Sequence, residues 1–400
     1  MKAVDFTQLI SPSSSLEAEY GPLAQPPEVQ AASMKIAHVV DSMEVGGAET
    51  LVAQLCRLQR AEGCDPRVYA VLTLGPLGER MRAEGFAVEA NVGRHLPEAT
   101  RNFYRIFKQA RPDVVHLHNP TPTIYGGPAA RMAGVASIVS TRHSLVAPPH
   151  KLVAELKYAM AATSCDWVAG ICEATVSNLK SLHSVPARKI VRVYNGAEPL
   201  RRVAREDWPV KDGFTMLYVG RLAPVKNHAL LLKAFYAALA ASSELRGPEL
   251  RLWMVGDGSE RAALEGLASQ LGIKAQVTFW GQQLDVAPFF SAADAFIMSS
   301  RSEGLPMSLL QAFSLGLPAI VTDVGGMAEV VRLAQAGFTV TGEAEMAAAI
   351  LRLAGEAAER ERFSKNAEAA FQARFTLPVM AAAYMDLYRE TPRARRAVKR

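Results

Sequence analysis

Short apolar runs alternate with helical patterns along most of this chain, and this alternation constrains the fold more than any other feature. In one helical segment of the first half, Leu51, Leu55 and Leu58 fall on one face. Strands that alternate with helices predict a parallel sheet covered by helices on both faces. The strand-like runs of this half are residues 36–40, 68–72, 114–118, 137–141, 167–171 and 190–194.

The alternation stops at residues 195–212 and then starts again. That stretch, NGAEPLRRVAREDWPVKD, is polar, contains two prolines and has no clear period, so it predicts a linker. The later strand-like runs are almost continuously apolar, which suits strands buried on both faces. They are residues 215–220, 250–256, 277–281, 295–299 and 319–324, and a helical pattern extends from 343 to about 390.

The predicted fold class is α/β, with two Rossmann-like doubly wound parallel-sheet domains that face each other across a cleft. Residues 1–33 contain SPSSS and QPPE but no apolar signal segment, so they predict a disordered N-terminal extension, with Met34 as an alternative start. The predicted divisions are an N-terminal domain at 34–195, a linker at 196–212, a second domain at 213–376, and a C-terminal helix with a basic tail at 377–400.

Composition excludes several classes of protein. The chain has no run of about 18 apolar residues, so it predicts no membrane-spanning helix. Its net charge of +5 lies largely in the tail, which is either a solvated end or a segment attracted to an anionic membrane; no motif indicates nucleic-acid binding. No Cys-x-x-Cys pair is present, and the four cysteines predict buried thiols in a reducing compartment, the cytoplasm.

The motifs of several enzyme classes are missing as well. The sequence has no Gly-x-Ser-x-Gly nucleophile elbow and no Walker lysine loop. It also lacks an Asp-x-Asp pair placed to hold a metal for a nucleotide-sugar. These absences disfavour an α/β-hydrolase, a P-loop ATPase and a metal-dependent transferase.

Two cations flank a loop that follows a predicted strand in the second half. In VGRLAPVKN, Arg221 and Lys226 stand on either side of the loop, and a helix is predicted to begin near Asn227. Cations at the carboxyl end of a strand, beside a helix N-terminus, can bind a diphosphate. They can also neutralise the charge on a leaving diphosphate, so no metal is required. The alternative is a pair of ordinary surface charges.

A lone acid precedes a glycine at the mouth of an apolar helix in SEGLPMSLLQAFSLGLPAI. Gly304 allows a ligand to approach the backbone closely, and Pro306 suits the first turn of the helix. Glu303 can therefore accept hydrogen bonds from sugar hydroxyls, and the amide of Gln311, eight residues later, suits a diol. The alternative is a helix-end charge favoured by the macrodipole and a polar surface position.

Glycines and histidines follow other predicted strands. Gly46 and Gly47 precede a helix predicted near Glu49, which indicates either a site that a phosphate or sugar approaches or a plain turn. His116 and His118 fall on one strand face, but the sequence offers no convincing third ligand, so no metal site is predicted. His118 and Asn119, at the strand end, can line a pocket. His143 ends another strand-like run.

The ordered set of motifs resembles glycosyltransferase family 4, whose members are retaining transferases with the two-domain GT-B architecture. The resemblance covers roughly residues 35–390 and rests on GGAE, HLHN, STRHS, YNG, VGRLAPVKN, VGDG and SEGLPMSLLQAFSLGLPAIVTDVGG. Each motif is weak by itself, whereas their order along the chain is specific.

The resemblance implies roles for individual residues. Arg221 and Lys226 correspond to the pair that holds the donor diphosphate, and Glu303 to the first acid of the Glu-x7-Glu motif, which contacts donor sugar hydroxyls. Gln311 stands where the family has its second Glu, which contacts the ribose, so that charge is missing here. The resemblance places His143 near the transferred sugar. The other implied positions are Gly46, Gly47, Gly256, Gly258, Gln282, Gly304 and Leu305 for the donor, and His118 and Asn119 on the acceptor side.

The activity that this resemblance implies is transfer from a UDP- or GDP-sugar to an acceptor hydroxyl, in cell-surface polysaccharide or glycolipid biosynthesis, without a cofactor or metal. A nucleotide-sugar epimerase and a non-catalytic binding protein of the same fold are the alternatives. Residues 151–162 carry two lysines beside an apolar face, which indicates either peripheral membrane contact that reaches a lipid-linked acceptor or, more commonly, a helix that turns its apolar side to the core.

Overall fold

The computed structural model describes residues 33–93, 95–145, 152–181, 183, 185–204, 213–244 and 247–390. The chain from Met34 onward forms one compact unit. Residues 1–32 of the predicted extension, the linker segment 205–212 and the basic tail 391–400 lie outside the described residues. Among the helices that are described, none combines the length and the apolar character needed to cross a membrane.

The first sheet contains seven parallel strands in the order β3-β2-β1-β4-β5-β6-β7. The first strand, β1, lies in the interior of the sheet. The next two strands, β2 and β3, follow on one side of it, and β4 to β7 follow on the other, so the strand order reverses between β1 and β4. Ligands of such sheets bind at the carboxyl ends of the strands on either side of this reversal. The strands are β1 (Lys35–Val40), β2 (Asp65–Ala70), β3 (Ala87–Glu89), β4 (Val114–His118), β5 (Ser137–Arg142), β6 (Trp167–Gly170) and β7 (Ile190–Arg192).

The second sheet contains six parallel strands in the order β10-β9-β8-β11-β12-β13. Here the reversal lies between β8 and β11, so the loops after these two strands are the expected ligand site. These loops carry the motifs VGRLAPVKN and SEGLP. The strands are β8 (Phe214–Val219), β9 (Leu250–Val255), β10 (Val277–Gly281), β11 (Ala295–Met298), β12 (Ala319–Thr322) and β13 (Gly337–Val340).

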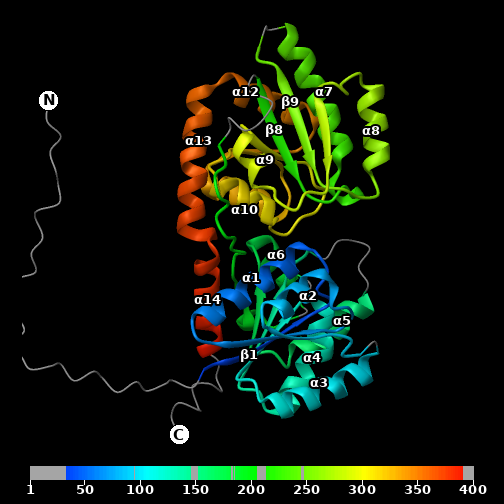
Figure 1. The fold of residues 1–400 in the computed structure, drawn as a ribbon, viewed down its shortest axis with the longest axis vertical. Helices are drawn as coiled ribbons and strands as arrows, with labels where there is room; N and C mark the ends of the chain where they lie inside the picture. The colour runs from blue at the N-terminus through cyan, green and yellow to red at the C-terminus, as the bar shows by residue number, and fades with distance from the viewer. Residues whose placement is uncertain are drawn as a thin grey trace, which may run out of the picture. The chain divides into compact units, whose positions relative to one another are not determined.

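Helices connect the strands and cover both sheets (Figure 1). Those of the first domain are α1 (Gly47–Ala61), α2 (Gly75–Ala83), α3 (Leu96–Ala110), α4 (Pro120–Ala133), α5 (Leu152–Ala162) and α6 (Glu173–Ser181). Those of the second are α7 (His228–Glu244), α8 (Arg261–Gln270), α9 (Ala287–Ala292), α10 (Met307–Ser314), α11 (Gly325–Ala334), α12 (Glu343–Gly355) and α13 (Ala357–Ala370). The predicted fold class, two Rossmann-like parallel-sheet domains, is thereby confirmed.

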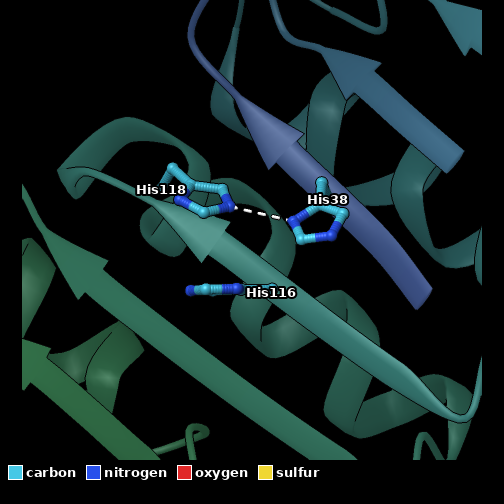
Figure 2. A group of neighbouring side chains, drawn as sticks. All are labelled: His38, His116 and His118. Atoms are coloured by element: carbon cyan, nitrogen blue, oxygen red, sulfur yellow. Dashed lines mark hydrogen bonds between the residues drawn. The ribbon is translucent and has the colours of Figure 1, made fainter. Parts of the chain in front are cut away.

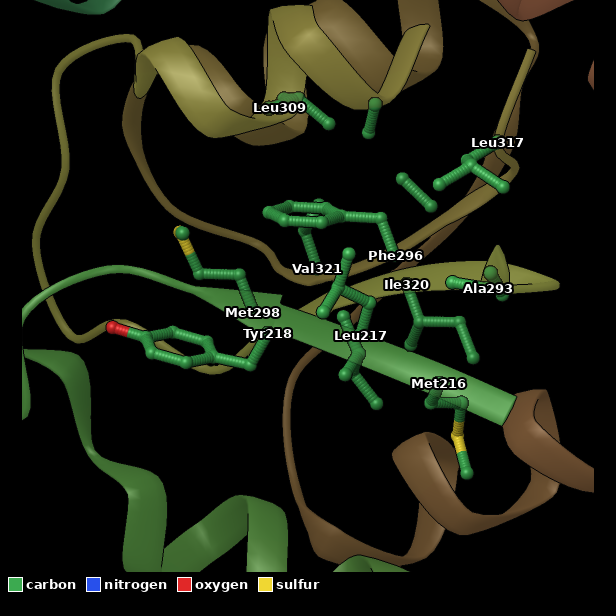
Figure 3. Packing of buried hydrophobic residues seen from close by; sticks show 14 of the residues in the cluster. Met216, Leu217, Tyr218, Ala293, Phe296, Met298, Leu309, Leu317, Ile320 and Val321 are labelled. Carbon is green, nitrogen blue, oxygen red and sulfur yellow. The ribbon is translucent and has the colours of Figure 1, made fainter. Parts of the chain in front are cut away.

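Apolar side chains of the second sheet pack in layers against its helices. Figure 3 shows Leu217 of β8, Phe296 of β11 and Val321 of β12 packed beneath Leu309 of α10. All four side chains are fully buried. Burying side chains of this size contributes roughly 1.5–3 kcal/mol each to folding. The two loops that follow β8 and β11 therefore begin from a rigid support.

The last helix of the chain packs on the first domain. After α13 a π-helical turn, Phe371–Phe375, leads into α14 (Leu377–Arg389), which lies beside the first domain (Figure 1). Its Tyr384 and Tyr388 are buried together with residues of the first sheet. Because residues 196–197 and 375–377 both cross between the domains, they run side by side and exchange backbone hydrogen bonds of 2.9 Å at Ala197.

Two strands have no counterpart among the predicted runs. They are β3 and β13, and each lies at one edge of its sheet. An edge strand is covered on fewer sides, so it needs fewer apolar residues: β3 has a single buried position, and β13 begins with a glycine. Neither segment therefore carries the apolar run that marks the central strands.

Candidate functional site

A cavity of about 780 Å³ lies where the two domains meet at the carboxyl ends of their strands. Its walls come from the glycine loop before α1, from the loops after β8 and β11, and from the first turns of α10. The cavity brings together six residues singled out in the sequence: Gly46, Gly47, Arg221, Lys226, Glu303 and Gln311. Segments separated by more than 250 positions thus share one site.

The loop that carries Arg221 is held by its own domain. The buried Tyr218 donates its hydroxyl to the carbonyl of Arg221 at 3.1 Å, and the amide of Leu222 donates to the carbonyl of Asp257 at 2.9 Å. Gly256, with φ of +132°, passes so close that a Cβ there would lie 2.0 Å from the carbonyl oxygen of Gly220. Only glycine allows this approach. The exposed Arg221 side chain therefore projects from a fixed loop.

Lys226 and Glu303 form an ion pair at the cavity wall, and both side chains are largely buried, with 15% and 18% of their surfaces exposed. The hydroxyl of Ser300 also donates to Glu303, at 3.2 Å. The backbone on either side is tied together, since Ser299 donates to the carbonyl of Lys226 at 2.9 Å. A cation and a carboxylate held side by side can bind a phosphate and a sugar hydroxyl of one ligand.

The backbone of the Glu303 loop is braced from behind. Gly325, with φ of +57°, lies against it so closely that a Cβ would be 1.7 Å from the carbonyl oxygen of Glu303. The amide of Gly326 donates to the carbonyl of Gly304 at 2.7 Å, and Asn195 of the first domain donates to the carbonyl of Leu305 at 3.1 Å. The carboxylate of Glu303 is thereby positioned at the cavity.

Gln311, half-buried on α10, lies between two cavities. The second cavity, of about 500 Å³, adjoins the first, and the residues Gln54, Glu198 and Gln311 line both. Gln54 donates its side-chain amide to Glu198 at 3.2 Å, and these two residues come from the first domain and the interdomain crossing. The position that the resemblance matches to a ribose-binding carboxylate therefore holds a neutral amide, and the carboxylate of Glu198 lines the same two cavities.

The first domain contributes an acid that the sequence argument did not assign. Glu49, in the first turn of α1, folds back over the glycine loop, so that a Cβ on Gly46 would lie 2.3 Å from its Oε2. Burial raises the pKa of Glu49, whereas a hydrogen bond to its own backbone lowers it. The GGAE motif was the available signal, because it puts this acid one turn into the helix. Gln54 and Glu198 had no comparable motif.

The other proposed donor positions lie around the cavity and are not among its wall residues in the described part of the chain. Gly256 and Gly258 support the Arg221 loop, because a Cβ on Gly258 would lie 2.2 Å from the carbonyl oxygen of Leu222. Gly304 and Leu305 are buried behind Glu303. Gln282 is exposed on the loop after β10. The glycines among these residues thus support the loops that carry Arg221 and Glu303. Contact between any of the five residues and a donor stays a prediction.

The proposed acceptor-side residues are not among the cavity's wall residues in the described part of the chain. His118, at the end of β4, is buried and its Nδ1 is 3.1 Å from Nε2 of His143. Asn119, with φ of +77°, accepts a hydrogen bond from the backbone amide of His143 at 3.2 Å. Burial lowers the pKa of His143 to about 4 and that of His118 well below its ordinary value. His118 and Asn119 thus hold His143 in place.

The structure supplies a third histidine that the sequence did not reveal. His38 of β1 is in register with His116 of β4, and the ligand atoms of His38, His116 and His118 all lie within 4.8 Å of one another (Figure 2). A cluster of this kind can hold a transition metal. Each of the six ring nitrogens, however, already has a protein hydrogen-bond partner.

Two family descriptions match consecutive parts of the sequence. "Glycosyltransferase Family 4" matches residues 45–201, and "Glycosyl transferases group 1" matches residues 201–370. The chain belongs to the group 1 glycosyltransferases. Both matches meet at the crossing between the domains, so this family assignment covers both walls of the cavity.

Curated glycosyltransferases match over different lengths. The lipopolysaccharide core biosynthesis glycosyltransferases LpsD and LpsE of Rhizobium meliloti (strain 1021) are 31% and 33% identical over 50% and 40% of this chain. The matches span 57% and 47% of those proteins, about half their length. The putative glycosyltransferase EpsF of Bacillus subtilis (strain 168) is 29% identical over 72% of this chain and 79% of its own.

Solved structures share the whole fold. Anabaena Alr3699/HepE in complex with UDP superposes with a TM-score of 0.77 and 19% identity, covering 88% of this chain and 99% of that one. WaaG, a glycosyltransferase involved in lipopolysaccharide biosynthesis, superposes with a TM-score of 0.68 and 18% identity, over 88% and 99%. At these identities the likeness shows the fold, which is GT-B.

Proposed function

We propose that this chain is a retaining glycosyltransferase that transfers a sugar from a nucleoside diphosphate donor to an acceptor hydroxyl. One observation carries the proposal: Arg221, Lys226 and Glu303 meet at a single cavity between two Rossmann-like domains. Two cations suit a diphosphate, and a carboxylate beside them suits sugar hydroxyls. A nucleotide-sugar contains these groups in this order.

In the proposed reaction the acceptor hydroxyl attacks the anomeric carbon on the face from which the diphosphate departs. The bond from that carbon to the phosphate oxygen breaks, and its electron pair stays on the oxygen. That oxygen then takes the acceptor proton, so a separate protein base is not required. Arg221 and Lys226 stabilise the charge that develops on the diphosphate, and this makes a metal ion unnecessary. The cavity walls orient both reactants and exclude water.

The donor is proposed to be a UDP-sugar, with a GDP-sugar as the next choice. The Anabaena HepE structures contain UDP and UDP-glucose, and an Escherichia coli relative is named as a UDP-Gal transferase acting on a diphosphoundecaprenol-linked sugar. Two relatives are named for lipopolysaccharide core biosynthesis. These names support a saccharide or lipid-linked saccharide acceptor in cell-surface polysaccharide or glycolipid biosynthesis.

The experiment that tests this function begins with binding. UDP, GDP and ADP are compared by thermal unfolding, each with magnesium and with a chelator. A ligand at about 100 times its dissociation constant stabilises the folded chain by roughly 2.7 kcal/mol. We expect a shift with UDP that is independent of magnesium. If no nucleotide shifts the transition, the proposed donor site is wrong.

Transfer is then measured as release of UDP from UDP-sugars, with lipopolysaccharide core fragments and polyprenyl diphosphate sugars as acceptors. The anomeric configuration of the product is read by NMR, and retention is expected. Donor binding without turnover in any of these mixtures would favour a binding protein of the same fold. Conversion of the donor sugar without an acceptor would favour an epimerase.

The proposed location is the cytoplasmic face of a membrane, with peripheral contact through α5. The expectation that this helix turns its apolar side to the core holds for the buried Tyr158, Ala161 and Ala162, but three large apolar residues point outward. Val153, Leu156 and Met160 share an outer face and are 68%, 63% and 66% exposed. Exposed apolar residues at this spacing indicate an interfacial helix.

Positive charge accompanies this apolar face. The helix α3, which lies on the same side of the sheet, exposes Arg101, Arg105 and Lys108, and Arg111 follows at its end. Each cation near an anionic lipid surface contributes about 1 kcal/mol to the free energy of membrane binding. We therefore expect co-sedimentation with vesicles that contain phosphatidylglycerol and weak binding to pure phosphatidylcholine. Leu156→Asp should reduce vesicle binding about tenfold, whereas Val379→Asp on α14 should leave it unchanged. Equal effects of the two variants would show that the outer face of α5 is not the membrane contact.

A further inference from the structure

Three polar side chains from three different segments converge where the two cavities adjoin. Gln54 comes from α1, Glu198 from the crossing between the domains and Gln311 from α10, and each of them lines both cavities. Nε2 of Gln54 donates to Oε2 of Glu198 at 3.2 Å. A carboxylate oxygen only accepts hydrogen bonds, so this contact fixes which end of the amide faces Glu198. These three residues are called the polar junction below.

The backbone that carries Glu198 is held on both sides. Before it, Ala197 exchanges backbone hydrogen bonds of 2.9 Å with the other crossing between the domains. After it, the amide of Leu200 donates to Oγ of Ser314 at 3.1 Å, and that hydroxyl donates to the carbonyl of Gln311 at 2.7 Å. Because these bonds join the crossing to α10, Glu198 and Gln311 keep a fixed relation to each other.

The polar junction retains unused hydrogen-bonding groups. Glu198 is exposed, and in the described part of the chain its Oε1 has no hydrogen-bond partner. The side-chain amide of the half-buried Gln311 also has none among the described residues. Arg57, about one turn beyond Gln54 on α1, is bound instead to Glu84 at 2.7 and 2.8 Å. The junction therefore offers a carboxylate oxygen that accepts and an amide that both donates and accepts.

These unused groups suit two neighbouring hydroxyls of one ligand. A hydroxyl carries one proton that it can donate, and its oxygen can also accept. One hydroxyl can donate to Oε1 of Glu198, while its neighbour exchanges hydrogen bonds with the amide of Gln311. A hydrogen bond to an ionised group is roughly twice as strong as one between neutral groups. Glu198 should therefore contribute most of the preference for a diol over a ligand that lacks one hydroxyl.

The surroundings of the polar junction match the order of groups in a nucleoside diphosphate. Arg221 and Lys226 line only the first cavity, where two cations suit a diphosphate. Beyond the junction, the second cavity adds apolar walls beside Arg201 and Asp285, which suit the faces of a planar base. In a nucleoside diphosphate the ribose diol stands between these two parts. The apolar walls are Pro199, Leu200, Val203, Ala287 and Pro288.

We propose that Glu198, together with Gln311, binds the ribose diol of the nucleotide and makes this chain select ribonucleotides over deoxynucleotides. The assignment rests on the proposed function, which supplies a nucleoside diphosphate donor. Glu198 contacts the ligand, whereas Gln54 is a positioning residue that holds the other oxygen of the carboxylate. The crossing between the domains thereby recognises the ligand as well as joining the two domains.

The test is titration calorimetry of the full chain with UDP, 2′-deoxy-UDP and 3′-deoxy-UDP. We expect the wild type to bind UDP about tenfold more tightly than at least one of the deoxynucleotides, because the lost hydroxyl leaves a charged acceptor unpaired. Glu198→Ala should lower the affinity for UDP and spare that for the deoxynucleotide, so that the preference falls to about twofold. An unchanged preference in Glu198→Ala would overturn the proposal.

The matched control is Glu345→Ala. Glu345 is an exposed carboxylate that also accepts hydrogen bonds, at 2.7 and 2.9 Å from Thr341, and it is not a wall residue of either cavity. Its removal changes the net charge by the same amount as Glu198→Ala. The full preference for UDP should remain in this variant. A loss equal to that of Glu198→Ala would show an effect of net charge and would contradict a direct contact.

A relocated carboxylate separates ligand contact from a structural role. Combining Glu198→Ala with Gln311→Glu returns an acid to the polar junction from α10 but does not restore the hydrogen bond to Gln54. We expect the preference for UDP to recover to about fivefold or more, because a carboxylate again accepts from the diol. Gln54→Leu should reduce the preference about threefold, because it releases the carboxylate of Glu198. If the double variant stays at the level of Glu198→Ala, direct contact with the diol is refuted.

Two further outcomes separate this inference from the proposed function and from an acceptor site. If Glu198→Ala raises the KM for the acceptor and leaves UDP affinity unchanged, the diol belongs to the acceptor saccharide and the ribose assignment is wrong. If the wild type binds UDP without preferring it to either deoxynucleotide, this inference fails and the proposed function stands. Binding of none of UDP, GDP and ADP would refute the proposed function, and the ribose assignment with it.

Discussion

Lys226 and Glu303 share one buried ion pair, so the loss of either residue leaves the other unpaired at the cavity wall. Arg221 is exposed and carries its charge from a loop fixed by backbone contacts. We expect Arg221→Ala and Lys226→Ala each to lower kcat by about a hundredfold or more, because one preorganised donor to a developing charge contributes on that scale. The measurement is release of the nucleoside diphosphate under saturating donor.

The control for these variants is Lys365→Ala. Lys365 is an exposed cation on α13 that pairs with Glu361 at 2.7 Å, and it lies away from the cavity walls. Its removal should leave kcat within about twofold, because an exposed pair contributes little. Full activity in Arg221→Ala or Lys226→Ala would remove that residue from the mechanism. Equal losses in all three variants would indicate a general effect of charge.

Gln311 tests whether a neutral amide replaces the ribose-binding carboxylate of the family. Gln311→Glu should keep nucleotide affinity or improve it, because both side chains can accept hydrogen bonds from a diol. Gln311→Leu should weaken binding about tenfold, since it leaves a ribose hydroxyl unpaired in the cavity. Titration calorimetry with UDP measures both. Complete loss of binding in Gln311→Glu would refute the ribose assignment.

For individual residues, the sequence predicts site residues that directly follow a strand. It does not predict residues that come into contact only when distant segments fold together. Arg221, Lys226, Glu303 and Gln311 stand in motifs at strand ends, and the structure places them at one cavity. His38 and Gln59 could not be found in this way, because His38 is 80 positions from His118 and 21 positions from Gln59, and no local spacing encodes these contacts. These contacts exist only after the sheet has formed.

The strands β1 and β4 bury histidines side by side, and this gives the first domain a predictable sensitivity to acid. Burial lowers the pKa of His38 from 6.5 to about 4, and a hydrogen bond to Gln59 raises it slightly. His143 is lowered to about 4 by burial. The unfolded chain therefore binds more protons below about pH 6.5, so the stability present above that pH decreases as pH falls towards 4.

At pH 5 the loss should be roughly 2 kcal/mol for each of these two histidines, measured as the free energy of unfolding in urea at pH 5 and pH 7.5. His183→Gln is the control, because His183 is exposed and should not change this dependence. The opposite sign, with higher stability at pH 5, would contradict the buried neutral state.

Among the elements, the central strands could be predicted from the sequence, whereas two of the four outermost strands, β3 and β13, could not. A strand between two neighbours is covered on both faces and needs a continuous apolar run, as in β8 and β11. The three residues of β3 alternate between exposed and buried, and the four of β13 are mostly half-buried. The helix α5 was ambiguous for a related reason, because an apolar stripe does not reveal which side faces the core.

At the scale of the whole molecule, a carboxylate of the second domain binds groups of the first domain. Glu329 of α11, in the second domain, accepts hydrogen bonds from the first domain: the backbone amide of Glu173 at 2.8 Å, that of Ala174 at 3.4 Å, and the hydroxyl of Tyr194 at 2.6 Å. The two amides begin α6, where a helix N-terminus favours a negative charge. The paired crossings at 196–197 and 375–377 would remain if this contact were lost.

Glu329→Ala should therefore loosen the closed arrangement without separating the domains. We expect a larger radius of gyration by small-angle X-ray scattering in the absence of nucleotide, and recovery of the wild-type value on adding UDP, because the ligand contacts both walls. The free energy of unfolding should fall by about 1–2 kcal/mol, the usual effect of removing a helix cap. The matched control is Glu345→Ala, whose carboxylate binds the amide and hydroxyl of Thr341 at 2.7 and 2.9 Å within the second domain. That variant should lose a similar local stability at an unchanged radius, so an unchanged radius in Glu329→Ala would show that the crossings alone hold the domains together.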